Sequence, residues 1–161
     1  MGGASRRRIV VFDLGGVLIE HNPRHLYRKL FDDAGAMEDF LATVCTPAWN
    51  RRQDAGRPIA KAVAQLQAEH PEKAGLIAAY YGRWSEMLRG AVDGTVAILA
   101  DLRACGTPFY ALTNWSAETF PIARARFGFL GWFQGIVISG EVGLIKPDRR
   151  IFELLCATHG F

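Results

Sequence analysis

The sequence contains few cysteines, and none of them are arranged as in a disulfide framework or a zinc site. Cys45, Cys105 and Cys156 lie far apart, are odd in number and include no C-x-x-C pair. A chain of this kind fits a reducing compartment, and we expect a cytoplasmic protein.

Long hydrophobic runs are also missing near the N-terminus. The apolar run Ile9–Phe12 stops at Asp13, far short of a signal-peptide core or a membrane span. The Met1 start lacks the Ser or Thr that N-myristoylation requires at the sixth position, where Arg6 stands. We therefore expect no membrane partner, and we interpret Met1–Arg8 as a solvated tail.

A large charge of either sign is absent as well. The 19 basic and 16 acidic residues give a net charge of +3, and much of the excess lies in Arg6, Arg7 and Arg8. This short basic tail is too small to indicate nucleic-acid binding. What the sequence does contain is apolar side chain for a core, since 50% of its 161 residues are hydrophobic. One folded domain is expected, and extended disorder is excluded.

Apolar and helical segments alternate along the chain. The predicted strands are Ile9–Phe12, Phe109–Leu112 and Gly135–Ser139. The predicted helices that accompany them are Val92–Ala104, Thr119–Arg126 and about Pro147–Thr158. We expect Pro147 in the first turn of the last helix, where its missing N–H has no cost. The alternation predicts an α/β fold with a Rossmann-like, doubly wound parallel sheet.

Residues 20–90 interrupt this alternation. Their pattern is helical and is divided into four or five helices by Pro47, Gly56-Arg57-Pro58 and Pro71. The segment is too long for a simple crossover between strands. We predict that residues 20–90 form an inserted helical cap, and that residues 9–19 and 91–161 form the core.

Polar residues follow each of the three predicted strands. Asp13 follows the first strand, Thr113 and Asn114 follow the second, and the third leads to Lys146. Ligands of open α/β sheets bind outside the carboxyl ends of the strands, so we expect these residues to converge on one edge. A carboxylate, a hydroxyl with an amide, and an ammonium suit a phosphate or another anion beside a nucleophile.

These strand-end motifs resemble those of the haloacid dehalogenase superfamily of hydrolases. Phe12–Val17 resembles the first motif of the family, Leu112–Asn114 the second and Val142–Asp148 the third, in the order of the family. The resemblance runs from Ile9 to the last residue. It is strongest for the subgroup that contains a sugar-phosphate phosphatase and the phosphatase domain of soluble epoxide hydrolases.

The resemblance implies a role for each motif residue. Asp13 would attack phosphorus and form an aspartyl-phosphate that water then hydrolyses. It would also bind Mg²⁺ together with the backbone carbonyl of Gly15. Thr113 and the backbone of Asn114 would hydrogen-bond the phosphoryl oxygens, and Lys146 would neutralise their charge.

The glycines of the first motif, Gly15 and Gly16, would let backbone N–H groups approach the anion without a Cβ in the way. The resemblance thus implies a Mg²⁺-dependent phosphatase whose partner is a small-molecule phosphate ester, bound between cap and core. Taken singly, Asp13 is also explained as a helix N-cap, and Lys146 as a solvated residue before a helix.

Other polar and aromatic residues have simpler interpretations. The four histidines share no metal-ligand spacing and are interpreted as surface or packing residues. Trp49, Arg51, Arg52 and Trp115 are candidates for the cap side of the pocket, although ordinary packing or solvation explains them better.

One departure from the family pattern concerns proton transfer. Most phosphatases of the family carry a second aspartate two residues after the nucleophile, as general acid and base, and here that position is Gly15. The enzyme should then favour substrates whose leaving group is already good, or a cap residue or water must take the place of this aspartate. A halide leaves without a proton, so a 2-haloacid dehalogenase is the enzymatic alternative. That branch usually has an aromatic residue in place of Gly15 and a serine in place of Thr113, which ranks it lower.

The other departure concerns the fourth motif, an acidic pair that follows a fourth strand and completes the Mg²⁺ site. That strand and motif would lie beyond Lys146 and the helix that follows, where the sequence stops at Phe161. In the family the fourth strand lies beside the first, so without it Ile9–Phe12 would be an exposed edge. We expect a chain truncated after its third strand and helix, or a second copy that covers the edge as a homodimer or by strand swapping. A non-catalytic binding module with this fold is the third hypothesis.

Overall fold

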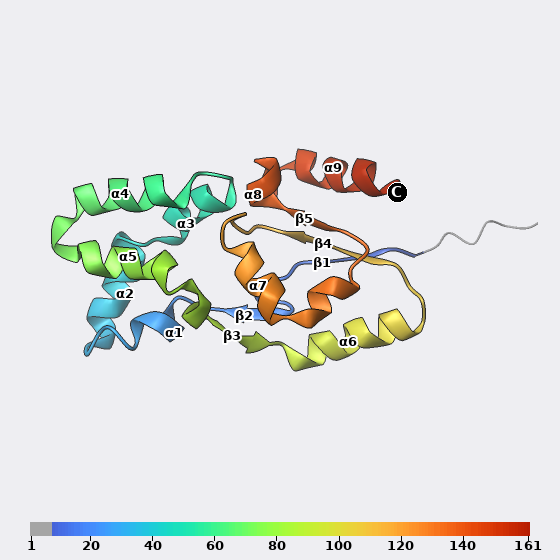
Figure 1. Ribbon diagram of the computed structural model, residues 1–161, viewed down its shortest axis with the longest axis horizontal. Helices are drawn as coiled ribbons and strands as arrows, with labels where there is room; N and C mark the ends of the chain where they lie inside the picture. The colour runs from blue at the N-terminus through green and yellow to red at the C-terminus, as the bar shows by residue number, and fades with distance from the viewer. Residues whose placement is uncertain (1–7) are drawn as a thin grey trace, which may run out of the picture.

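The computed structural model describes residues 8–161, so nearly all of the predicted tail lies outside the described residues. A parallel sheet of three strands forms the centre of this part of the chain (Figure 1). Its strands lie in the order β1 (Val10–Phe12), β4 (Phe109–Thr113) and β5 (Ile136–Ile138). All three predicted strands are present, and the parallel α/β fold is confirmed.

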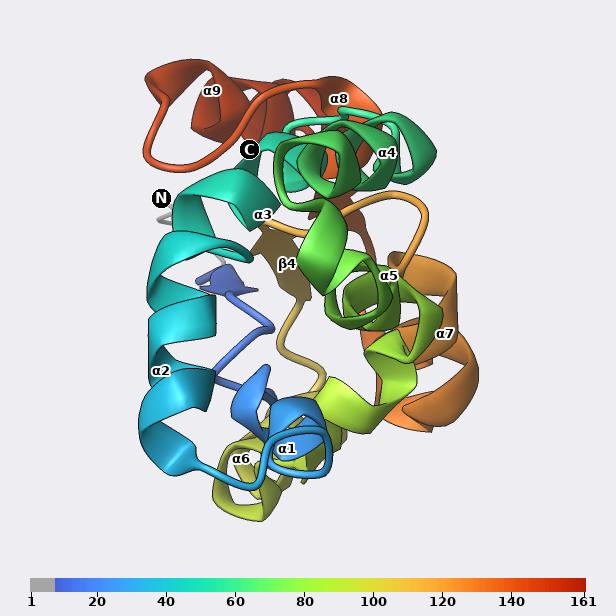
Figure 2. The same cartoon turned by 90° about the vertical axis from the view of Figure 1, so that its left-hand side faces the viewer.

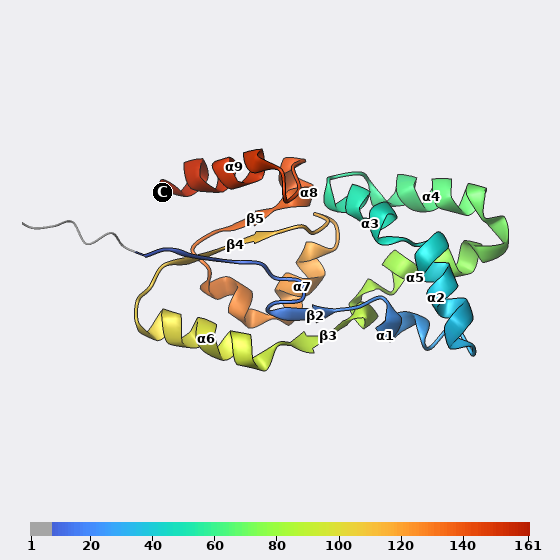
Figure 3. The same ribbon diagram turned by 180° about the vertical axis from the view of Figure 1, so that it is seen from behind.

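The central strand β4 is buried on both faces. Its alternate side chains belong to two different hydrophobic clusters. Helix α9 (Arg149–His159) covers one cluster through Ile151 and Leu155. Figures 1 and 3 show α6 (Asp93–Ala104) and α7 (Phe120–Arg126) on the opposite side of the sheet. Coverage of both faces explains why the sequence of β4 is a continuous apolar run rather than an alternating one.

The first strand lies at the edge of the described sheet. Within residues 8–161, β1 pairs with β4 alone, and Val11 on β1 is 42% exposed. An exposed apolar edge of this kind is the feature that the sequence predicted for Ile9–Phe12.

The last helix begins later than predicted. Asp148 is its N-cap residue, and the carboxylate accepts a hydrogen bond from the Arg150 N–H at 2.9 Å. The prediction that Pro147 belongs to the first turn is wrong, because the side-chain cap at Asp148 sets the start of the helix at Arg149. The third strand also ends early, because Ser139 begins a short helix, α8 (Ser139–Val142), that the sequence did not indicate.

Helices fill most of the segment between Glu20 and Gly90. They are α1 (Arg24–Tyr27), α2 (Ala34–Thr43), α3 (Pro47–Asp54), α4 (Ile59–Glu69) and α5 (Ala74–Gly82). Short 3₁₀ turns are η1 (Pro71–Lys73), η2 (Trp84–Met87) and, outside this segment, η3 (Gly128–Trp132). Figure 1 shows the five helices beside the sheet, at the end where β1 and β4 finish, and in Figure 2 α2, α3 and α5 surround the end of β4. We call residues 20–90 the cap; these boundaries stay a prediction.

The cap packs around aromatic side chains. The ring of Tyr80 lies 5.2 Å from that of Trp49 and 5.0 Å from that of Tyr81, within the range of favourable edge and offset contacts. Trp49 and Tyr80 are buried in the same hydrophobic cluster as Phe109 and Ala111 of β4. Cap and core therefore share one continuous apolar interior.

Two short strands lie where the chain enters and leaves the cap. β2 (Ile19–His21) and β3 (Leu88–Ala91) pair in antiparallel fashion, with Ile19 opposite Ala91. The sequence did not predict them, because neither segment is long enough to show a period of two. No helix within residues 8–161 is long and apolar enough to cross a membrane.

Candidate active site

A carboxylate and an ammonium meet at the carboxyl edge of the sheet. Asp13 is the first residue after β1, and its Oδ2 lies 2.8 Å from the Nζ of Lys146. Lys146 Nζ also donates a hydrogen bond of 2.8 Å to the carbonyl of Leu112 at the end of β4. The Lys146 side chain is 20% exposed and the Asp13 side chain 43%. The structure thus brings the first and third predicted motifs together and leaves the carboxylate accessible.

The chain turns sharply after Asp13. The carbonyl of Leu14 accepts hydrogen bonds from the N–H groups of Val17, Leu18 and Ile19, and Gly16 adopts a φ of +76°. Because that backbone conformation is costly for residues with a Cβ, glycine is favoured at position 16.

The two glycines make different backbone contacts. Gly16 N–H donates to the carbonyl of Ile19 at 2.9 Å and is engaged in the turn, and a role of Gly16 toward an anion stays a prediction. The Gly15 carbonyl accepts no hydrogen bond within residues 8–161, so it is free to bind a cation. A Cβ at either glycine would meet nothing within 4 Å, so close packing does not explain them.

The second motif lies directly beside this pair. Thr113 is 1% exposed, and its buried Oγ1 has no hydrogen-bond partner in the described part of the chain. An unpaired buried hydroxyl is costly, so Thr113 Oγ1 is a candidate donor to a ligand oxygen.

Asn114 uses its side chain to hold the loop that carries Lys146. Its Oδ1 accepts a hydrogen bond from Lys146 N–H at 2.8 Å, and its Nδ2 donates to the Lys146 carbonyl at 3.1 Å. The same carbonyl accepts a further hydrogen bond of 2.9 Å from the guanidinium of Arg51 on α3. Sequence reasoning considered only the backbone of Asn114 and did not anticipate this clamp.

The donors available to a metal ion are oxygens. The carboxylate of Asp13 and the free carbonyl of Gly15 are hard ligands of the kind that Mg²⁺ prefers, and Mg²⁺ commonly takes one or two carboxylates with water and substrate phosphate. The described residues contain no cluster of three or more His, Cys, Asp or Glu side chains suited to a metal. The donor set therefore fits Mg²⁺ bound with a phosphate, and fits zinc poorly.

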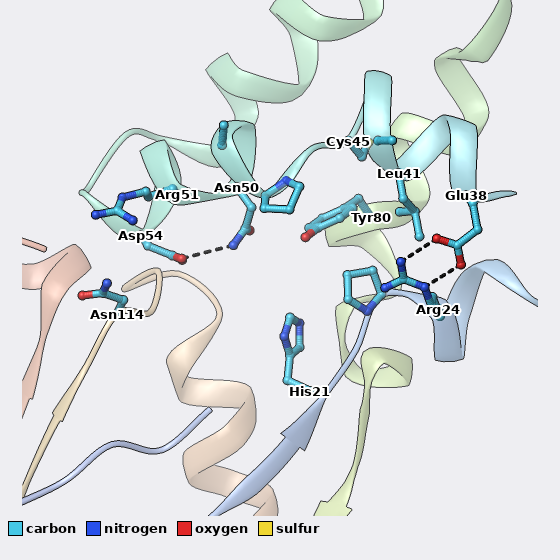
Figure 4. A pocket seen from close by; sticks show the side chains of 14 residues that line it. His21, Arg24, Glu38, Leu41, Cys45, Asn50, Arg51, Asp54, Tyr80 and Asn114 are labelled. Carbon is cyan, nitrogen blue, oxygen red and sulfur yellow. Dashed lines mark hydrogen bonds and ion pairs between the residues drawn. The ribbon is translucent and has the colours of Figure 1, made fainter. Parts of the chain in front are cut away.

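A cavity of about 870 Å³ opens between the cap and this edge of the sheet (Figure 4). Its cap side is mixed: apolar side chains such as Leu41, Ala42, Cys45 and Tyr80 line it together with the charged Arg24, Glu38 and Arg51. A second, smaller cavity of about 60 Å³ shares several of the same walls and reaches Gly15. The predicted motif residues Gly15 and Asn114 therefore line the two cavities.

The sequence did not mark three residues that line the cavities. His21, interpreted as a surface or packing residue, does pack against Trp84 with ring centroids 4.5 Å apart, but it also lines both cavities, and burial lowers the pKa of its imidazole to about 4. Asp54 and Asn50 also line both cavities, and Asn50 Nδ2 donates to Asp54 Oδ2 at 3.1 Å. Burial raises the pKa of Asp54 to about 6, although the Ser116 N–H and Arg51 act in the opposite direction. No periodicity or spacing marked these residues.

The four candidates for the cap side of the pocket have different outcomes. Arg51 lines the larger cavity and Trp115 the smaller one. Trp49 packs against Tyr80 in the interior of the cap, and Arg52 is exposed.

The described part of the chain thus combines a doubly wound sheet with an accessible carboxylate, a lysine and an open cavity at its carboxyl edge. The sequence profile of the haloacid dehalogenase-like hydrolases matches residues 7–161. The chain therefore belongs to this family of hydrolases, as the three motifs predicted.

Individual relatives agree with this assignment. The chain is 25% identical over 146 residues to the sesquiterpene phosphatase astK of Aspergillus oryzae, covering 91% of this chain and 71% of that protein. Its fold is similar to that of the HAD family enzyme BT-2542 of Bacteroides thetaiotaomicron, with a TM-score of 0.70, 20% identity and coverage of 96% and 79% of the two chains. A predicted HAD-like hydrolase of Porphyromonas gingivalis gives a TM-score of 0.68, 19% identity and coverage of 96% and 77%.

Proposed function

We propose that this hydrolase is a Mg²⁺-dependent phosphatase that cleaves a small-molecule phosphate ester through a phosphorylated Asp13. The observation that carries the proposal is the ion pair of 2.8 Å between Asp13 and Lys146 at the carboxyl edge of the sheet. The relative from Aspergillus oryzae is a phosphatase by name, and one crystal structure of BT-2542 contains magnesium and inorganic phosphate.

The residues at the edge divide the chemistry among them. Asp13 Oδ would attack phosphorus as the ester P–O bond breaks, and water would then cleave the new acyl phosphate. Lys146 would offset the negative charge of the phosphoryl oxygens as a fixed point charge. The unpaired Thr113 Oγ1 would donate a hydrogen bond to one of them. When bound at Asp13 and Gly15, Mg²⁺ would supply further positive charge.

The cavity supports a substrate whose alcohol has an apolar body. One part of the cap-side wall is apolar, formed by Leu41, Ala42, Cys45 and Tyr80 beside the paired Arg24 and Glu38, and the volume of about 870 Å³ exceeds that of a phosphate group alone. The similarity to a protein named for a sesquiterpene substrate points in the same direction. We expect a larger kcat/KM for hexyl phosphate than for a sugar phosphate, and the opposite order would remove this part of the proposal.

Hydrolysis of p-nitrophenyl phosphate tests the central proposal. We expect turnover with Mg²⁺, its loss in EDTA, and a fall of at least about three orders of magnitude in Asp13→Asn, because the nucleophile is removed. Asp101 on α6 is exposed, so Asp101→Asn is the matched control and should behave like the unsubstituted protein.

Two results would overturn the proposed phosphatase function. Metal-independent release of halide from a 2-haloacid, without phosphatase activity, would identify the dehalogenase alternative. Binding of hexyl phosphate without hydrolysis, in the presence of Mg²⁺, would identify the non-catalytic module.

A further inference from the structure

The cap contributes a carboxylate to the cavity on the side that faces the core. Asp54 is the last residue of α3, and Figure 4 shows it between Asn50 and Asn114 with its carboxylate directed into the cavity. It lines both cavities, and the smaller one, of about 60 Å³, also has Gly15 in its wall. A small space thus separates Asp54 from the turn that follows Asp13.

A direct contact with the core holds Asp54 in this position. Its carbonyl accepts a hydrogen bond of 2.5 Å from Ser139 Oγ, and Ser139 is completely buried at the end of β5. Its carboxylate accepts a hydrogen bond of 3.1 Å from Asn50 Nδ2 on the same helix. Asp54 therefore belongs to the edge of the sheet in position, although it belongs to the cap in sequence.

The turn after α3 packs closely on the core as well. Gly56 adopts a φ of +98°, and a Cβ added there would lie 3.3 Å from the carbonyl of Gly140. Farther along, the N–H of Ile59 donates to Glu118 Oε1 at 2.8 Å. These contacts restrict how far the carboxyl end of α3 can move away from the sheet.

Asp54 has the protonation behaviour that an acid and base requires. With its pKa raised to about 6, the carboxyl group exchanges its proton near neutral pH, where general acid–base catalysis is most effective. The ionisable groups around it are Arg51 on its own helix, Tyr80 and Tyr81 on α5, and His21 across the cavity. His21 is the weaker candidate, because burial lowers its pKa to about 4 and leaves it neutral, with no proton to give as an acid.

We propose that Asp54 is the catalytic acid and base of this enzyme, and that it takes the place of the aspartate that Gly15 replaces. The proposal rests on the proposed phosphatase function. As Asp13 Oδ bonds to phosphorus and the ester P–O bond breaks, the carboxylic acid of Asp54 gives its proton to the departing alcohol oxygen. In the second step the Asp54 carboxylate takes a proton from water, as the water oxygen bonds to phosphorus and the Asp13–phosphorus bond breaks. Inorganic phosphate leaves, and both aspartates return to their initial states.

The test compares a poor leaving group with a good one. Hexyl phosphate must release a strongly basic alkoxide unless it is protonated, whereas p-nitrophenyl phosphate releases a weakly basic phenolate. Rapid-quench single-turnover experiments with Mg²⁺ measure the first chemical step for each substrate. We expect Asp54→Asn to slow this step at least about 100-fold more for hexyl phosphate than for p-nitrophenyl phosphate, as loss of a general acid predicts.

A second signature comes from the hydrolytic step. Without its base, Asp54→Asn should accumulate phosphorylated Asp13, so p-nitrophenyl phosphate should give a burst of one nitrophenolate per enzyme followed by slow turnover. Asp39 on α2 is an exposed cap aspartate outside both cavities, so Asp39→Asn is the matched control and should show neither effect. Asp54→Glu should restore part of the rate on hexyl phosphate.

The outcomes separate this proposal from the phosphatase function. If the unsubstituted protein hydrolyses neither ester, the proposed function fails. If it hydrolyses both and Asp54→Asn slows them equally, or slows neither, then Asp54 is structural or irrelevant and the catalytic role is refuted. Urea titration of each variant shows that a loss of rate is not a loss of folding.

Discussion

Substitution of Ser139 by alanine should uncouple the cap from the core. Ser139 is completely buried, and its hydroxyl both accepts a hydrogen bond of 2.9 Å from the Trp115 N–H and donates one of 2.5 Å to the Asp54 carbonyl. Alanine leaves the buried Trp115 N–H and the half-buried Asp54 carbonyl without a partner. Each such group costs about 1–3 kcal/mol, so Ser139→Ala should lower the free energy of unfolding by about 2–4 kcal/mol.

Urea titration and thermal unfolding measure this loss. For a chain of this size about 1 kcal/mol corresponds to a few degrees, so we expect the melting temperature to fall by roughly 5–15 °C. Ser85 in η2 is exposed, and Ser85→Ala is the control, with a change within about 0.5 kcal/mol.

Equal stability of Ser139→Ala and Ser85→Ala would refute a stabilising role of the Ser139 hydroxyl. That result would mean that water or a shifted backbone satisfies the Trp115 and Asp54 groups, and that the serine does not fix the carboxyl end of α3. A large loss of stability combined with a selective loss of activity on hexyl phosphate would connect this contact to the role of Asp54.

Two further substitutions test the account. In Gly140→Ala the new Cβ would lie 2.8 Å from the Trp115 carbonyl and closer still to the Ala117 nitrogen, so we expect the free energy of unfolding to fall by more than about 3 kcal/mol. The control is Gly75→Ala on α5, where a Cβ meets nothing within 4 Å, and its free energy of unfolding should rise by about 0.5–1 kcal/mol. Equal urea midpoints for the two variants would contradict the close approach at Gly140. Asp54 binds its proton more tightly in the folded state, with a pKa near 6 against an ordinary value of 3.8, so its stabilising contribution is complete below about pH 4 and is lost as the pH rises through 6. Between pH 4 and 7 the free energy of unfolding of the unsubstituted protein should therefore fall by about 2–3 kcal/mol relative to that of Asp54→Asn. If urea titration shows the two free energies changing with pH in parallel, Asp54 is not buried.

The pair of Asp13 and Lys146 was predictable because parallel strands end at a common edge. Asp13 follows β1 and Lys146 follows the loop beyond β5, and topology alone brings them to one side of the sheet. The strands that position both residues were predictable from their apolar runs, since a strand covered on both faces has a continuous hydrophobic sequence.

The contribution of the cap to the site was not predictable in this way. Asp54 reaches the edge of the sheet because Ser139, far along the chain, holds the end of α3 through a hydrogen bond to the Asp54 carbonyl. His21 lies in the cavity because β2 pairs with β3, a contact between segments separated by the entire cap. Such contacts between distant residues leave no periodic signal in the sequence. The start of α9 was missed for a more local reason, because Asp148 and Pro147 are both good helix-start residues and the cap at Asp148 prevails.

The identity of the nucleophile is the central claim, and trapping the covalent intermediate tests it most directly. Mg²⁺ and a radiolabelled phosphate ester are mixed with the protein, the reaction is stopped in acid within a fraction of a turnover, and the labelled peptide is identified by mass spectrometry. We predict label on Asp13 and none in Asp13→Asn. Steady turnover with label on another residue, or with no labelled residue at any time, would contradict a mechanism through phosphorylated Asp13.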